Sequence, residues 1–108
     1  MLRIHDVALQ LVRDVAPIAG AIARHDADLA RQLRKALSSV PLNVSEGSDQ
    51  RGARRGSHYS IALGSAREAW SALLTAEAWG YVAAPPENVA ARFNHVIGVL
   101  HRVVHVRR

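Results

Sequence analysis

Apolar residues recur every three or four positions in four successive segments of this chain, and this spacing places side chains on one face of an α-helix. The apolar stripe of the first segment consists of Ile4, Val7, Leu11, Val15, Ile18 and Ile22. Charged residues fall largely between these positions. Pro17 and Gly20 are expected to bend or shorten this first helix, because proline removes a backbone hydrogen bond.

The second segment carries a proline inside its apolar stripe. Asp26 is the predicted N-cap of this helix, and Asp28 should lie in its positive first turn. The stripe consists of Leu29, Leu33, Leu37, Val40, Val44 and Gly47. Because the stripe continues in register across Pro41, we interpret the proline as a kink within one helix and not as a helix end.

The third segment follows a stretch of glycine, serine and charge, GSDQRGARRGS at 47–57, which predicts a loop. A helix should then run from about Ser57 to about Trp79. Its apolar face consists of Tyr59, Leu63, Ala66, Trp70, Leu73 and Leu74. The opposite face consists of Ile61, Ser65, Ala72, Thr75 and Trp79, with Glu68 as its charge. A helix that is apolar or small nearly all round should be covered on more than one side. A bundle of 108 residues has little material for that, so we expect a second subunit there.

The fourth segment follows the connector GYVAAPPEN, in which Gly80 suits a helix end and Pro86 suits the first turn of another helix. Its apolar stripe consists of Val89, Phe93, Val96, Ile97, Leu100, Val103 and Val104. The valine-rich end VLHRVVHVRR at 99–108 could form a strand, but the helical period holds there and no partner strand is evident. The sequence therefore predicts one all-α domain of four helices over residues 1–108.

The composition excludes several kinds of chemistry. The chain has no cysteine, which rules out disulfides, thiolate catalysis and cysteine-based zinc sites. Its net charge is +5, and its cations are nearly all arginine, whose planar fork suits phosphate; a coding bias towards arginine explains the composition equally well. No apolar run reaches the roughly 18 residues that a transmembrane helix needs. Asp6, Arg13 and Asp14 interrupt an N-terminal stretch that otherwise imitates a signal peptide, so we expect a cytoplasmic protein.

Three stretches carry a resemblance to a known family: QLRKALSSVPLNVSEG at 32–47, YSIALGSAREAW at 59–70 and GY at 80–81. They resemble the short four-helix-bundle proteins encoded in intervening sequences of bacterial large-subunit ribosomal RNA genes, which are related to the accessory variability proteins of diversity-generating retroelements. The family pattern is roughly Ser-Ile-Pro-x-Asn-Ile-Ala-Glu-Gly followed by Ala-Leu-Gly-Ser-x-x-Glu. Here Val40 and Val44 replace isoleucines and Ser45 replaces an alanine, while Pro17 and the turn RHDAD depart from the family at the first helix.

The resemblance implies an up-down four-helix bundle that assembles into a ring-like homo-oligomer, because family members look like ring-shaped homopentamers. It also implies a poorly defined molecular role. The retroelement relatives resemble basic proteins that contact nucleic acid as partners of a reverse transcriptase, and their role reaches this chain only by analogy.

The first candidate site is a set of basic residues. In an antiparallel bundle the end of the second helix, the start of the third and the end of the fourth should lie near one another. Repeated around a ring, such a cluster would bind nucleic acid through its phosphates, without sequence readout. The alternative is a solvated, arginine-biased surface, and aromatic residues that might stack on bases are missing from these stretches. The candidate residues are Arg31, Arg34, Lys35, Arg51, Arg54, Arg55, Arg102, Arg107 and Arg108.

The second candidate site is a polar set beside the apolar stripe of the second helix. Two carboxylates in one pocket could perform acid–base chemistry if their pKa values were split. We favour the structural alternative, in which these side chains bind neighbouring helices or a neighbouring subunit and fix their register. The set consists of Ser39, Pro41, Asn43, Glu46, Ser65 and Glu68.

The histidines offer little chemistry. His101 and His105 lie one helical turn apart, but two ligands do not close a metal site. The chain lacks a P-loop, a GxSxG elbow and a GxGxxG motif. We therefore expect no catalytic residues, metal, cofactor, small-molecule substrate or membrane partner. The leading hypothesis is a non-enzymatic homo-oligomer that binds RNA or DNA, and the alternative is a protein–protein assembly module without a nucleic-acid role.

Overall fold

Four helices make up the chain, as the computed structural model shows over residues 2–49 and 52–106. They are α1 (Leu2–Ala23), α2 (Ala27–Ser48), α3 (Gly52–Ala78) and α4 (Glu87–His105). No strand occurs within these residues, so the all-α prediction is confirmed, and the valine-rich end is helical to His105. Within the same ranges no helix combines the length and the hydropathy that a bilayer crossing needs.

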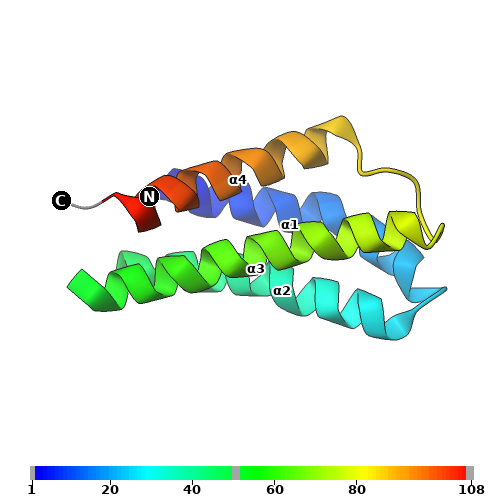
Figure 1. Cartoon of the computed structure of the whole chain (residues 1–108), viewed down its shortest axis with the longest axis horizontal. Coiled ribbons are helices and arrows are strands. Elements are labelled where there is room, and N and C mark those ends of the chain that lie inside the picture. Colours follow the sequence, from blue (N-terminus) through cyan, green and yellow to red (C-terminus); the bar gives the residue numbers. More distant parts are fainter. Residues whose placement is uncertain (1, 50–51, 107–108) are drawn as a thin grey trace.

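Successive helices run in opposite directions along an elongated bundle of 44 × 24 × 20 Å (Figure 1). Each helix packs against its neighbours in sequence, and α4 returns to pack against α1. One cross-link between these two helices is the ion pair of Arg92 with Asp14, whose other carboxylate oxygen accepts a hydrogen bond from the Gln10 amide at 2.9 Å. As Figure 1 shows, both termini lie at the end where α2 finishes and α3 starts.

Both interior prolines lie within continuous helices. The first helix was expected to be bent or shortened at Pro17; it is not shortened, because α1 continues through Pro17 to Ala23, and a bend there stays a prediction. Val15, Ala19 and Ile22 on either side of Pro17 are buried, and burying such side chains offsets the roughly 3 kcal/mol that an interior proline costs. The interpretation of the second segment as one helix across Pro41 is confirmed. A kink at Pro41 stays a prediction.

The start of α3 corrects a second expectation. The helix begins at Gly52 instead of about Ser57, so Arg54 and Arg55 are helical and do not lie in a loop. Contacts with the end of α2 explain the early start. The Arg55 Nε donates a hydrogen bond of 3.2 Å to the carbonyl of Gly47, and the Tyr59 ring lies on the same residue. Such tertiary contacts outweigh the poor helix propensity of glycine.

The core is built from small and branched residues, and α2 and α3 make its most extensive contact. Four alanines of α3 are completely buried, which lets the two helices approach closely: Ala62, Ala66, Ala69 and Ala76. Trp70 is half-buried and its ring lies 5.1 Å from that of Phe93 of α4. Leu74, expected on the apolar face, is 41% exposed, because it lies at the edge of that face. Ile61 on the opposite face is 49% exposed.

Candidate nucleic-acid interface

One end of the bundle gathers arginines from three different helices. Figure 1 shows the start of α1, the start of α3 and the end of α4 at this end. These elements carry the exposed residues Arg3, Arg54, Arg55 and Arg102, which we call the arginine end. The predicted residues Arg51, Arg107 and Arg108 lie outside the described residues. The predicted basic set did not include Arg3, although an up-down topology places the start of the first helix at this end of the bundle.

The four residues of the arginine end are not equivalent. Arg55 is bound to the last turn of α2 through the Gly47 carbonyl, where its charge also complements the negative end of the helix. Arg55 therefore has a structural role. Arg54 is exposed on the neighbouring position of α3, and Arg102 is exposed on the last turn of α4. These two are the better candidates for contacts with phosphates.

The three cations of α2 do not belong to this cluster. At a rise of about 1.5 Å per residue, Arg34 lies roughly 20 Å from the end of α2 at Ser48. Arg34 lines a pocket against α1, whereas Arg31 and Lys35 line a pocket against α3. The predicted basic set therefore divides into the arginine end and a separate group on α2.

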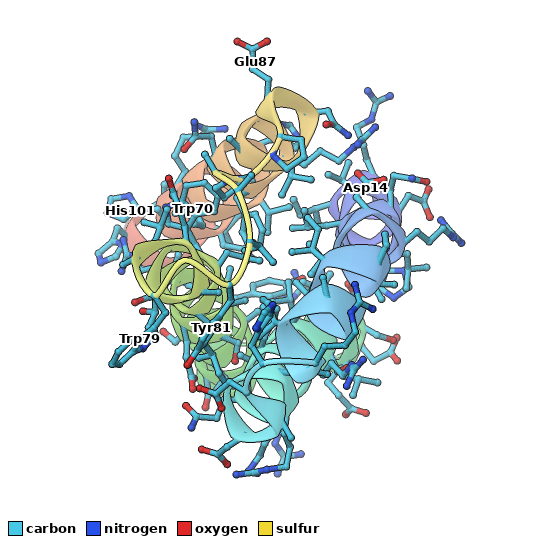
Figure 2. All side chains as sticks on the ribbon, turned by 90° about the vertical axis from the view of Figure 1, so that its right-hand side faces the viewer. Asp14, Trp70, Trp79, Tyr81, Glu87 and His101 are labelled. Atoms are coloured by element: carbon cyan, nitrogen blue, oxygen red, sulfur yellow. The ribbon has the colours of Figure 1, made fainter. Side chains whose placement is uncertain are left out.

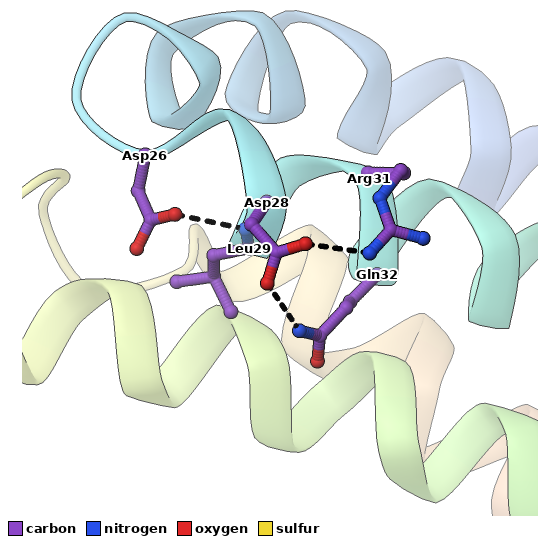
Figure 3. A network of polar contacts seen from close by, with 5 residues as sticks. All are labelled: Asp26, Asp28, Leu29, Arg31 and Gln32. Atoms are coloured by element: carbon purple, nitrogen blue, oxygen red, sulfur yellow. Dashed lines mark hydrogen bonds and ion pairs between the residues drawn. The ribbon is translucent and has the colours of Figure 1, made fainter.

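One cation of the α2 group is paired with a carboxylate, and a second shares a pocket with one. Arg31 forms an ion pair with Asp28, whose second oxygen accepts a hydrogen bond of 2.8 Å from the Gln32 amide (Figure 3). The hydrogen bond from Arg31, then that from Gln32, lowers the pKa of the Asp28 carboxyl below its usual value. The pocket between α2 and α3, of about 370 Å³, is lined by Lys35 and also by Glu68. Two cations and one carboxylate line this pocket, and the Arg31 guanidinium is already paired with Asp28, so the pocket holds little free positive charge for a phosphate.

A chain of half-buried polar side chains connects α2 and α3 beside this pocket. The Asn43 amide nitrogen donates to the Ser39 carbonyl at 2.9 Å and to the Ser39 hydroxyl at 3.0 Å. The Ser65 hydroxyl lies 2.8 Å from that of Ser39. The Asn43 oxygen lies 3.1 Å from the Nδ1 of His58, so Nδ1 carries the proton in this contact, because Asn43 can only accept there. These hydrogen bonds link Ser39, Asn43 and Ser65, which the sequence predicted as a polar set, with His58, which it did not.

His58 carried no sequence signal of its own. The helix was expected to begin at about Ser57, which placed His58 at a helix junction and not opposite Asn43. Once α3 begins at Gly52, positions 43 and 58 face each other across the helical hairpin.

The two predicted carboxylates do not join the polar chain. Glu46 and Glu68 are both exposed. Glu46 lies on α2 near the level of His58, and Glu68 lies roughly 15 Å further along α3 at the helical rise. The structure therefore does not bring these carboxylates into one pocket, as a paired acid–base mechanism would require.

The remaining predicted residues have simple surroundings. Pro41 is buried in the core of the bundle. The exposed rings of His101 and His105 lie 4.2 Å apart, and His105 Nδ1 lies 2.9 Å from the carbonyl of His101. Among the described residues, no group of three or more side chains of the metal-binding types comes together.

Gly47 completes the α2–α3 junction. A β-carbon on Gly47 would lie 2.5 Å and 2.8 Å from two ring atoms of Tyr59, which is closer than real atoms pack. The Tyr59 hydroxyl in turn lies 3.5 Å from the Ser48 hydroxyl. Glycine at this position allows the ring of Tyr59 to close the end of the hairpin.

These features define an antiparallel four-helix bundle whose second helix contains a buried proline and whose central hairpin is joined by polar side chains. The chain belongs to the family of the 23S rRNA-intervening sequence protein, whose family model matches residues 1–102. Comparison with curated proteins and with solved structures finds no significant match.

Proposed function

We propose that this protein is a non-enzymatic, homo-oligomeric helical bundle that binds RNA or DNA through its arginine end. The observation that supports binding is the convergence of exposed arginines from α1, α3 and α4. Phosphate contacts of this kind give affinity without reading the base sequence. The separation of Glu46 and Glu68 supports a role without acid–base catalysis, cofactor or small-molecule substrate. A cytoplasmic location belongs to the same proposal.

The proposal includes assembly through the outer side of α3. Ile61 is exposed there although it is large and apolar, whereas Ser65 and Ala72 of the predicted outer face lie against α2. The family resemblance favours a ring of five subunits. Light scattering after size exclusion should then give five times the chain mass of 11.7 kDa. Ile61→Arg should reduce this mass, whereas Leu42→Arg, at a residue 64% exposed on α2, should not. A wild-type monomer would contradict the assembly.

Binding is tested by titrating a labelled mixed-sequence RNA, and its DNA counterpart, at several salt concentrations. Each phosphate contact that is lost should reduce the slope of log K against log salt by about 0.7 to 0.9. Arg54→Ala and Arg102→Ala should weaken binding and lower this slope. Arg67→Ala is the matched control, because Arg67 is also exposed on α3 but lies away from the arginine end.

The second candidate function is a protein–protein assembly module whose charge has no nucleic-acid role. The hydrogen bond of Arg55 to α2 and the ion pair of Arg31 favour it, because both give arginines structural partners. No binding at low salt, or equal binding by Arg54→Ala and Arg67→Ala, would leave this second function as the better account.

A further inference from the structure

Three aromatic rings stack at the end of the bundle opposite the arginine end. The Tyr81 ring lies 5.2 Å from that of His25, with an interplanar angle of 5°. It lies 6.1 Å from the Trp79 ring, with an interplanar angle of 15°. We call His25, Tyr81 and Trp79 the aromatic stack. Figure 2 views the bundle from this end and shows Trp79 projecting from the side of α3.

The backbone after α3 fixes the direction of the Tyr81 ring. Gly80 has a φ of 80°, which favours glycine. The Gly80 amide donates to the Glu77 carbonyl at 2.9 Å, and the Tyr81 amide donates to the Ala76 carbonyl at 3.0 Å. These two bonds form a Schellman motif, which ends the helix and turns Tyr81 back towards the α1–α2 turn. The GY pair at 80–81 therefore positions the stack.

Asp26 holds the centre of the stack from the other side. One carboxylate oxygen caps α2 by accepting from the Leu29 amide at 3.0 Å. The other accepts from the Tyr81 hydroxyl at 3.4 Å. Desolvation of the phenol, and then the charge of Asp26, raise the pKa of Tyr81, so the hydroxyl stays protonated and keeps donating. The central ring of the stack is thus held in place from both sides.

Trp79 remains 67% exposed although its ring stacks on that of Tyr81. The other tryptophan, Trp70, is half-buried against Phe93 and belongs to the core. Tryptophan provides a large flat surface at a low cost in conformational entropy, which is why it is enriched at binding surfaces. In this fold the flat surface of Trp79 is accessible to solvent.

The charges around the stack differ from those of the rest of this basic chain. Asp26 contacts Tyr81, Asp28 lies in the first turn of α2, and Glu77 lies in the last turn of α3. Arg24 and the paired Arg31 oppose these three carboxylates. A phosphate backbone is therefore disfavoured here, whereas a cation is favoured both by the carboxylates and by the π-faces of the rings.

We propose that the aromatic stack and its carboxylates bind an arginine-bearing basic segment of another protein. The guanidinium group is planar and weakly hydrated, so it can stack on Trp79 while its N–H groups face the carboxylates. Lysine matches the charge but not the flat stacking geometry. The site is separate from the arginine end, and so is independent of the proposed binding of nucleic acid.

The test is a titration of the wild-type chain with a labelled peptide of alternating arginine and Gly-Ser. Peptides with lysine in place of arginine, or with Gly-Ser alone, are run in parallel. The arginine peptide should bind most tightly and change the tryptophan fluorescence. Trp79→Leu should weaken its binding about tenfold, as loss of a cation–π contact predicts, and Glu77→Gln should weaken it less. Circular dichroism of each variant checks that the bundle is intact.

Two controls separate this site from the others. Leu42→Ala removes another exposed apolar side chain and should leave peptide binding within twofold of wild type, and so should Arg54→Ala. Unchanged binding by Trp79→Leu would overturn the proposal, as would equal binding of the lysine and arginine peptides. A fluorescence change on dilution alone would assign the stack to a second copy of this chain. A stronger response to a single-stranded oligonucleotide would assign it to nucleic acid. Either result would overturn the proposal.

Discussion

The ring of Tyr59 lies so close to Gly47 that a β-carbon at position 47 would come within 2.5 Å of a ring atom. This contact joins the last turn of α2 to the second turn of α3, and the Arg55 hydrogen bond to the Gly47 carbonyl reinforces it. Glycine at the end of SSVPLNVSEG is therefore a packing requirement, because Tyr59 is buried and its ring occupies the space that a β-carbon would need.

Gly47→Ala should destabilise the protein by about 1–3 kcal/mol, the usual cost of overpacking, despite the better helix propensity of alanine. Urea unfolding measures the change. Gly64→Ala is the matched control, because no atom lies within 4 Å of a β-carbon there and Gly64 is inside α3. Gly64→Ala should raise the free energy of unfolding by about 0.5–1 kcal/mol. Equal stability of the two variants would show that the Tyr59 ring moves freely.

Asn43 and His58 should be energetically coupled across the α2–α3 hairpin. Each single change, Asn43→Ala or His58→Ala, should lower the free energy of unfolding by about 1 kcal/mol, because it leaves a half-buried polar group without its partner. The double variant should lose less than the sum, with a coupling of about 0.5–1 kcal/mol. Additive losses in this double-mutant cycle would mean that the 3.1 Å contact contributes nothing.

Glu46→Gln should leave the stability of the bundle unchanged within about 0.5 kcal/mol, because the side chain is exposed. Thermal unfolding and light scattering together measure the effect. A lower oligomer mass with unchanged subunit stability would place Glu46 at a subunit contact. Unchanged mass and stability would mean that the role of Glu46 lies elsewhere.

Tyr81 should make stability depend on alkaline pH. Its folded pKa is raised above the usual value of 10.0 for tyrosine, so the folded state holds this proton more tightly than the unfolded state. The contribution is fully present below pH 10.0 and is lost as the pH rises through the folded pKa. Tyrosinate absorbance follows the ionisation, and denaturant unfolding at increasing pH follows the stability. Tyr81→Phe should remove this part of the dependence; the same profile in that variant would contradict the assignment.

Much of the bundle could be predicted from local pattern. The stripe through Pro41 predicts one helix, Asp26 caps α2 as expected, and Gly80 ends α3. These features depend on residues within a turn or two of one another. The start of α3 could not be predicted in this way, because GARRGS has weak propensity and is helical through contacts with α2.

The candidate site was predicted less completely, since its composition depends on surfaces that meet across helices. The sequence identified Ser39, Asn43 and Ser65 as polar residues bordering the core, but their hydrogen-bond partners follow from the alignment of α2 with α3. The sequence predicted one basic set of residues. The length of α2 separates the basic residues of that helix from those of the arginine end. Arg55 was expected in a loop, whereas it is helical and donates to the Gly47 carbonyl.

The sequence by itself determined four helices, the continuation of α2 through Pro41 and the helix signals at Asp26 and Gly80, because periodicity and capping are local properties of the chain. Only the tertiary structure decided that His58 meets Asn43, that the Tyr59 ring requires Gly47, and that Trp79 stacks on Tyr81 while remaining exposed. The reason is physical: each of these contacts depends on how closely two helices approach and in which register, and small residues spread over both helices set that distance together.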